Sequence, residues 1–201
     1  MACDLTLGRL EPCKDSVGGI KNIYFVDFGK LGTVGYDSTH TDVLDDFTGS
    51  TIGATAGSLT AYKYELKGAS SFEQTVVSSR DTGTTFYEQT LNITLKKLSA
   101  ADNKELKLMA WGRPHIAVED FNGSVFMMGL SNGAEVSGGT IVTGAAMGDL
   151  SGYTLSFSGQ EKTPANFFEI SVAATAVDYP FSVTDFPGLS GTITITEGTN
   201  T

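Results

Sequence analysis

The chain has 201 residues, a length at which all-β proteins often form one undivided domain around a single core. Its 24 glycines and low fraction of charged residues, 18%, favour strands and turns over amphipathic helices. The formal charge of −10 argues against a protein that grips nucleic acid through its phosphates, because such binding needs clustered Lys and Arg side chains. We therefore expect a single, mainly β domain over residues 1–201.

The N-terminal segment indicates neither a disulfide framework nor a secretory signal. Cys3 and Cys13 are too few and too close to the N-terminus for such a framework, and no further ligands accompany them for zinc, so we expect reduced thiols. An acid stands at Asp4, and the longest apolar runs, such as IYFV and LMAW, cannot span a membrane. We expect a protein that is made and works in a soluble compartment, with no membrane partner.

The first third of the chain predicts two strands separated by a long polar segment. Residues 21–28 form an apolar-rich strand between glycines, and residues 59–67 alternate so that Tyr62, Tyr64 and Leu66 mark the buried side. Between them, residues 30–57 are polar and rich in Gly and Thr, which is typical of an exposed arm. We expect an extended loop or arm here.

Residues 71–98 predict a hairpin whose second strand is unusually long. The apolar face of that strand carries Tyr87, Leu91, Ile93 and Leu95, and its hydrophilic face carries Glu88, Thr90, Asn92, Thr94 and Lys96. This strand is about twice as long as usual, so we expect its extended hydrophilic face to have a function. We expect the first strand of the hairpin to pair with it and to direct its corresponding side chains to the same face.

After Leu98 the period of the pattern changes, and residues 99–111 predict the one helix of the chain. Ser99 is placed as its N-cap with Asp102 three residues on, and Gly112 and Pro114 end it. Trp111, the only tryptophan, lies in the last turn. We expect its ring to fix the helix onto a sheet.

Two more hairpins and two further strands complete the predicted fold. Asn122-Gly123 is a strong two-residue turn signal, and pairing across it sets Val118 against Met127 and Asp120 against Val125. The next hairpin turns at residues 150–152, with a bulge expected at Gly138-Gly139 and with Thr154 and Ser156 facing outward. Strands are expected near residues 167–174 and 192–196. Because Phe167 and Phe168 are adjacent, one of them should face away from the core.

No recognisable catalytic or metal-binding motif occurs in the sequence. His40 and His115 lack the context of a metal site or a catalytic triad, and the DVLDD segment lacks the spacing of a calcium loop. The glycines of GGTIVTGAAMGD are not followed by the Lys-Ser or Lys-Thr of a phosphate cradle. We expect a structural protein without catalysis, cofactor or metal. An enzyme such as a glycosidase with paired carboxylates is a remaining alternative that no motif supports.

Three segments resemble tail tube proteins of tailed bacteriophages: GRLEPCKDSVGGIKNIYFVDFG, EQTLNITLKKLSAADNKELKLMAWGR and GGTIVTGAAMGDLSGYTLSFSGQEKTPANF. The resemblance covers most of the chain. It implies a β-sandwich or barrel-like subunit with one flanking helix, which assembles into hexameric rings stacked as a tube in the virion. It also implies a β-barrel inner wall through which DNA is ejected, and tape measure, tail terminator and baseplate proteins as partners.

The long strands with one packed and one hydrophilic face agree with this family. Such strands leave unpaired edges that favour pairing with a neighbouring subunit, and a head-to-tail interface can close into a ring. The residues expected to line the lumen are Glu73, Glu88, Thr90, Asn92, Thr94, Thr154 and Ser156. Those expected at contacts between subunits are Asp42, Asp45, Asp46 and Phe47 in the arm, and Phe168. An acidic lumen would let DNA pass without binding it.

Two alternative functions share parts of this pattern. A tail terminator or a baseplate tube protein would form similar rings, but in few copies. A capsid decoration protein or adhesin-like binding module could also be a Thr- and Gly-rich β-sandwich, and it would be a monomer or trimer that forms no tube.

Overall fold

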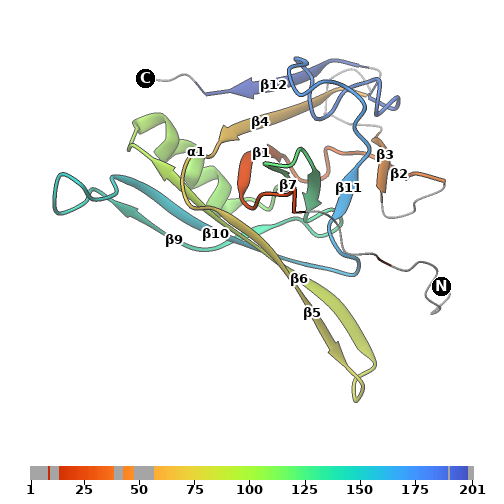
Figure 1. The fold of residues 1–201 in the computed structure, drawn as a ribbon, viewed down its shortest axis with the longest axis horizontal. Coiled ribbons are helices and arrows are strands. Elements are labelled where there is room, and N and C mark those ends of the chain that lie inside the picture. Colours follow the sequence, from red (N-terminus) through yellow and green to blue (C-terminus); the bar gives the residue numbers. More distant parts are fainter. Residues whose placement is uncertain (1–8, 10–13, 39–42, 48–56, 190, 199–201) are drawn as a thin grey trace.

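The structure is a computed structural model that describes residue 9 and residues 14–38, 43–47, 57–189 and 191–198. In these residues the chain forms two β-sheets and one α-helix, so the predicted mainly β fold with a single helix is confirmed. Figure 1 shows the smaller sheet, with its long hairpins, running across one side of the larger sheet.

The larger sheet, sheet A, has eight strands in the order β12-β4-β1-β7-β8-β11-β3-β2 (Figure 1). Their bounds are β1 (Ile20–Val26), β2 (Val34–Tyr36), β3 (Val43–Phe47), β4 (Leu59–Glu65), β7 (His115–Asp120), β8 (Val125–Met128), β11 (Asn166–Phe168) and β12 (Ile193–Glu197). The pairs β12-β4 and β11-β3 are parallel and the others are antiparallel. The segment expected as a strand over residues 167–174 is therefore strand only at its start, in β11.

Sheet A is covered on both faces. One face packs Tyr24 and Val26 of β1 against Phe181 and Phe186 of the irregular C-terminal segment. The other face packs Ile23 and other residues against the smaller sheet. Two-sided burial explains why β1 is a nearly continuous apolar run rather than an alternating one.

Burial on both faces also corrects the expected facing of β4. Leu59 and Ala61 are buried on one face of this strand, while Leu66, which follows it, is buried on the other. Tyr64 packs edge to face on Phe25, with ring centroids 5.3 Å apart, but Tyr62 is exposed. The alternation in this segment therefore does not distinguish a buried from an exposed side, because each side meets a core.

The smaller sheet, sheet B, is built from two long antiparallel hairpins in the order β5-β6-β10-β9. Its strands are β5 (Ser71–Ser79), β6 (Thr84–Lys96), β9 (Glu135–Val142) and β10 (Gly152–Glu161). Leu91, Ile93 and Phe157 on its inner face are almost completely buried against sheet A. The expected bulge is present: the pairing register between β9 and β10 shifts next to Gly138.

Helix α1 (Ala100–Trp111) has the predicted N-cap, because the Ser99 side chain accepts a hydrogen bond from the backbone N–H of Asp102 at 3.0 Å. Its inner side carries Leu106, which is buried, and Met109. Trp111 does not fix the helix to a sheet: its side chain is 75% exposed. At about 100° per residue, position 111 lies on the far side of the helix from both inner residues, which is why the expectation was wrong.

The turn between β7 and β8 differs from the two-residue turn that we expected. Residues 121–123 form a three-residue loop: the Asp120 backbone N–H bonds to the Ser124 carbonyl, and Gly123 has a φ of 85°. The Asp120 carboxylate accepts the backbone N–H of Asn122 and that of Ser124, which holds the extra residue in place. The register is therefore shifted by one, and Glu119 rather than Asp120 pairs with Val125.

The predicted arm, residues 30–57, is not structureless where it is described. It contains β2 and β3, and Leu44 of β3 is completely buried in the core. β3 pairs antiparallel with β2 and in parallel with β11, which lies more than a hundred residues later in the chain, so its place in the sheet depends on a distant strand. Asp42 lies outside the described residues.

Candidate functional site

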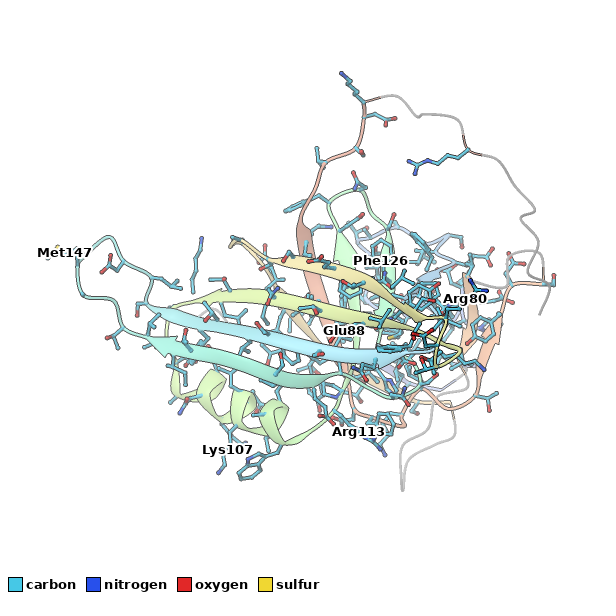
Figure 2. All side chains as sticks on the ribbon, turned by 90° about the horizontal axis from the view of Figure 1, so that it is seen from below. Arg80, Glu88, Lys107, Arg113, Phe126 and Met147 are labelled. Atoms are coloured by element: carbon cyan, nitrogen blue, oxygen red, sulfur yellow. The ribbon has the colours of Figure 1, made fainter. Side chains whose placement is uncertain are left out.

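The outward side of sheet B, called here the polar face, gathers all seven residues that the sequence predicts for a lumen. They are Glu73 on β5, Glu88, Thr90, Asn92 and Thr94 on β6, and Thr154 and Ser156 on β10. Strand pairing sets Thr90 opposite Glu73, Asn92 opposite Ser156 and Thr94 opposite Thr154, so they share one face. Figure 2 views sheet B from this side and labels Glu88.

The opposite side of the same strands explains why this face is turned outward. Leu91 and Ile93 alternate with Thr90, Asn92 and Thr94, and both apolar side chains are fully buried in the core between the sheets. A slip of one residue would expose these side chains and bury the polar ones, so the core fixes the register of the polar face.

Several polar side chains of this face are hydrogen-bonded to one another across the strands. The Ser156 hydroxyl donates to Asn92 Oδ1 at 2.6 Å, and the hydroxyls of Thr140 and Thr154 lie 2.6 Å apart. Each pair also joins two neighbouring strands, because Asn92 is on β6 and Thr140 is on β9. The result is an ordered, largely uncharged surface of hydroxyl and amide groups.

The charges of the polar face are mainly negative. The alternation of side chains along their strands places Glu73, Glu88 and Glu135 on this face. Within the described residues, Glu73 and Glu88 form no ion pair. Lys96 shares this alternation, but it lies at the end of β6 and its ammonium donates to the Lys67 carbonyl at 3.0 Å. The centre of the face therefore repels anions.

Sheet B ends at two long strands, β5 and β9, on which no further strand of the described chain pairs. Neither strand contains a proline or a lysine, the residues that commonly protect the edge of a sheet. Each also exposes an apolar side chain, since Val76 on β5 and Ile141 on β9 are both more than half exposed. Both edges are therefore suited to pairing with another chain.

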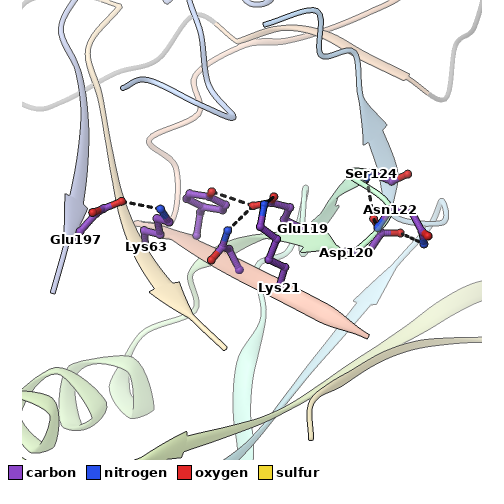
Figure 3. Close-up of polar contacts among 9 residues, drawn as sticks. Lys21, Lys63, Glu119, Asp120, Asn122, Ser124 and Glu197 are labelled. Carbon is purple, nitrogen blue, oxygen red and sulfur yellow. Dashed lines mark hydrogen bonds and ion pairs between the residues drawn. The ribbon is translucent and has the colours of Figure 1, made fainter. Parts of the chain in front are cut away.

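A separate polar cluster lies inside sheet A (Figure 3). The Glu119 carboxylate, with no exposed surface, accepts from Lys21 Nζ at 2.6 Å, Asn22 Nδ2 at 2.6 Å and the Tyr24 hydroxyl at 3.1 Å. Burial, and then the nearby negative charge of Glu119, raise the pKa of Tyr24. A register shift between Ile20 and Asn22 makes Lys21 a bulge residue. The cluster ties β1 to β7 and is structural.

The sequence gives only a weak signal for this cluster. Glu119 directly follows the apolar residues 116–118, and such a position is a candidate for a buried, paired carboxylate. Its partners lie almost a hundred residues earlier in the chain, in β1, so the pairing of the two strands must be known first.

His115 is also held by its own chain. Its Nε2 accepts the Gly29 N–H at 3.0 Å, so Nδ1 carries the proton and donates to the Gly129 carbonyl at 2.7 Å. Burial lowers the pKa of this imidazole, which keeps it neutral. Both ring nitrogens are occupied by backbone groups, so the side chain has a structural role. His40 lies outside the described residues.

The residues expected at subunit contacts differ in how far they are exposed. Asp45 is exposed on β3, and only the backbones of Asp46 and Phe47 are described. Phe168 was the wrong choice of the two adjacent phenylalanines: it is 7% exposed and packs against Phe181 and Phe186. Phe167 is the exposed one, at 47%, because the parity of β11 turns Phe168 towards the core.

Among the described residues, no group of three or more His, Cys, Asp or Glu side chains is arranged to hold a metal ion. In the same part of the chain, no helix has the length and apolar composition that a bilayer crossing requires. No protein-family model matches the chain, and a comparison with curated proteins finds no significant match.

Proposed function

We propose that this chain is the subunit of a phage tail tube, in which hexameric rings stack and the polar face lines the lumen. The observation that carries the proposal is the outward side of sheet B, where the predicted hydrophilic residues share one face between two unprotected edges. The tube, the hexameric ring and the location in the virion enter this proposal from the resemblance of the sequence to tail tube proteins. The protein is then structural, and it is made in the host cytoplasm.

The two edges of sheet B fit a closed ring. Strand directions alternate across the sheet, so β9 of one copy and β5 of the next can pair in the antiparallel sense. Such a contact is head to tail, and it removes both free edges of sheet B when the rotation closes. Each subunit then supplies four strands to one barrel, whose inside is the polar face.

The charge of the polar face fits a channel for DNA. Glu73, Glu88 and Glu135 repel phosphate, and at physiological salt this repulsion fades over about 8 Å. Duplex DNA is thereby kept from adhering to the wall without being excluded from the bore. Tape measure, tail terminator and baseplate proteins are the expected partners of such a tube.

The alternatives differ in assembly. A terminator or baseplate tube protein shares the ring but occurs in few copies, so its abundance in virions separates it from a tube subunit. A decoration or binding module leaves β5 and β9 unpaired and stays a monomer or small oligomer. The two long unprotected edges favour a protein whose neighbours are copies of itself.

Electron microscopy of the purified protein tests the proposal. Over a concentration series, with or without a tail-initiating partner, we expect hollow rods in negative stain and a matching loss of monomer in sedimentation. The Ile141→Lys variant, which places a charge in the β9 edge, should stay folded and form fewer rods. A wild-type protein that stays monomeric at every concentration would contradict the proposal.

A further inference from the structure

Helix α1 presents an exposed stripe that nothing in the described chain covers. Lys104, Lys107, Leu108 and Trp111 follow the i, i+3, i+4, i+7 spacing of one helix face, and we call them the α1 stripe. Trp111 is 75% and Leu108 51% exposed. Lys107 Nζ lies 4.6 Å from the centroid of the Trp111 ring, so charge and aromatic surface form one unit.

At the opposite edge of sheet B lies a row of three aromatic rings, of which one is exposed, Phe167, and two are half-buried, Phe72 and Phe126. Phe72 on β5, Phe126 on β8 and Phe167 on β11 follow one another, with centroids 6.3 Å apart for the first pair and 4.6 Å for the second. Phe72 and Phe126 line an open cavity of about 430 Å³ between the two sheets. We call the three rings and this cavity the aromatic notch.

The charges around the two surfaces are complementary. The α1 stripe carries Lys104 and Lys107, whereas the described residues that line the cavity of the aromatic notch include one acid, Asp120, and no base. Two exposed acids add negative charge beside Phe167. Asp45 lies two residues after Val43, the residue that pairs with Phe167, and Glu169 lies two residues after Phe167 itself, so the alternation of side chains turns both to the same face. A basic, aromatic helix face therefore matches an acidic, aromatic recess.

The two surfaces lie on opposite sides of the molecule. In Figure 2, Phe126 lies beyond β5, whereas Lys107 and Arg113 lie beyond β9, on the other side of sheet B. α1 packs next to β9, and Phe72 belongs to β5 itself. If β9 of one copy pairs with β5 of the next, α1 of the first copy lies on the side of the aromatic notch of the second.

We infer that the α1 stripe docks into the aromatic notch of the neighbouring copy of this chain. Trp111 and Leu108 fill the notch, and Lys104 and Lys107 face its acids. The contact rests on the proposed ring, because it uses the same head-to-tail order of subunits. It adds a side-chain anchor to the main-chain pairing of β9 with β5, with an aromatic residue near its centre as in many interface hot spots.

The single tryptophan makes this contact directly measurable. In dilute monomer, Trp111 is exposed, and its fluorescence should have a long-wavelength maximum and be quenched readily by acrylamide. In sedimented rods the maximum should move to shorter wavelength and quenching should fall several-fold. Rods whose emission equals that of the monomer would overturn the contact and leave the tube intact. No assembly at any concentration would overturn both the contact and the tube.

Variants identify the surface that receives Trp111. Phe167→Ser removes an exposed ring of the notch, so it should leave the monomer folded, reduce the spectral shift and raise the concentration for half-assembly by about thirtyfold. Val177→Ser, at an exposed apolar residue of the C-terminal segment, is the matched control and should change neither. If Phe167→Ser assembles and shifts like the wild type, or if the shift needs another virion protein, the occupant is not the neighbouring notch.

Discussion

The two sheets of this protein differ in how many of their faces are buried. Sheet A is covered on both sides, and its buried acid, Glu119, is surrounded by donors from its own chain. In the described part of the chain, sheet B is covered on one side only, and its other side is a hydrophilic surface between two edges on which no strand pairs. Sheet A therefore buries both of its faces within the chain, while sheet B leaves one face and two long edges available for contacts with other molecules.

The largest expected effect separates the two faces of a single strand. Phe157→Ala on β10 opens a cavity between the sheets and should lower the free energy of unfolding by about 3–5 kcal/mol. Ser158→Ala, one residue later on the polar face, should change it by less than about 0.5 kcal/mol. Urea unfolding of the monomer measures both. Equal losses would mean that the polar face is packed rather than wet.

A smaller effect is expected at the buried acid of sheet A. Glu119→Ala leaves the donors of Asn22 and Tyr24 buried without an acceptor and should cost about 2–3 kcal/mol in the same measurement. Glu197→Ala is the control, because Glu197 pairs with Lys63 at the surface, where such pairs contribute less than about 1 kcal/mol. A Glu119 variant as stable as the control would show that the cluster does not join β1 to β7.

The smallest effect on stability, with the largest expected effect on function, is predicted for sheet B. Glu73→Lys combined with Glu88→Lys should change the unfolding free energy by less than about 1 kcal/mol, since both side chains face outward. DNA delivery by virions that carry this variant should fall, on the order of tenfold, because the new lysines hold phosphate.

The control for this variant makes the same charge change on sheet A, with Glu65→Lys and Glu197→Lys, both at exposed positions. It should deliver DNA like the wild type. If the variant of the polar face misfolds, or if both variants deliver equally well, Glu73 and Glu88 do not line a channel.

Local patterns were enough to predict the elements that carry their own signal. Alternation along β6 separates Leu91 and Ile93 from Thr90 and Asn92, and the structure confirms that division. Ser99 and Asp102 mark the start of α1 in the same way. Each of these signals lies within one element, so no knowledge of distant partners was needed.

Other features, which the sequence did not reveal, depend on partners far away in the chain. β3 is a strand because β11 lies beside it, and Glu119 is buried because β1 brings three donors to it. Trp111 shows a different limit: its exposure follows from which side of α1 meets sheet B, and a short helix with few apolar residues does not specify that side clearly. The aromatic notch has no sequence signal, since its rings come from three separate strands.

The cross-strand hydrogen bonds of the polar face have a consequence for friction. Ser156 is hydrogen-bonded to Asn92, and Thr140 to Thr154, so in the proposed tube these groups would already have a partner when DNA slides past them. A phosphate that touches such a wall competes with these bonds for groups that already have a partner, so the net attraction is small. If the polar face lines a tube, these cross-strand bonds would keep its wall hydrophilic without making it adhesive.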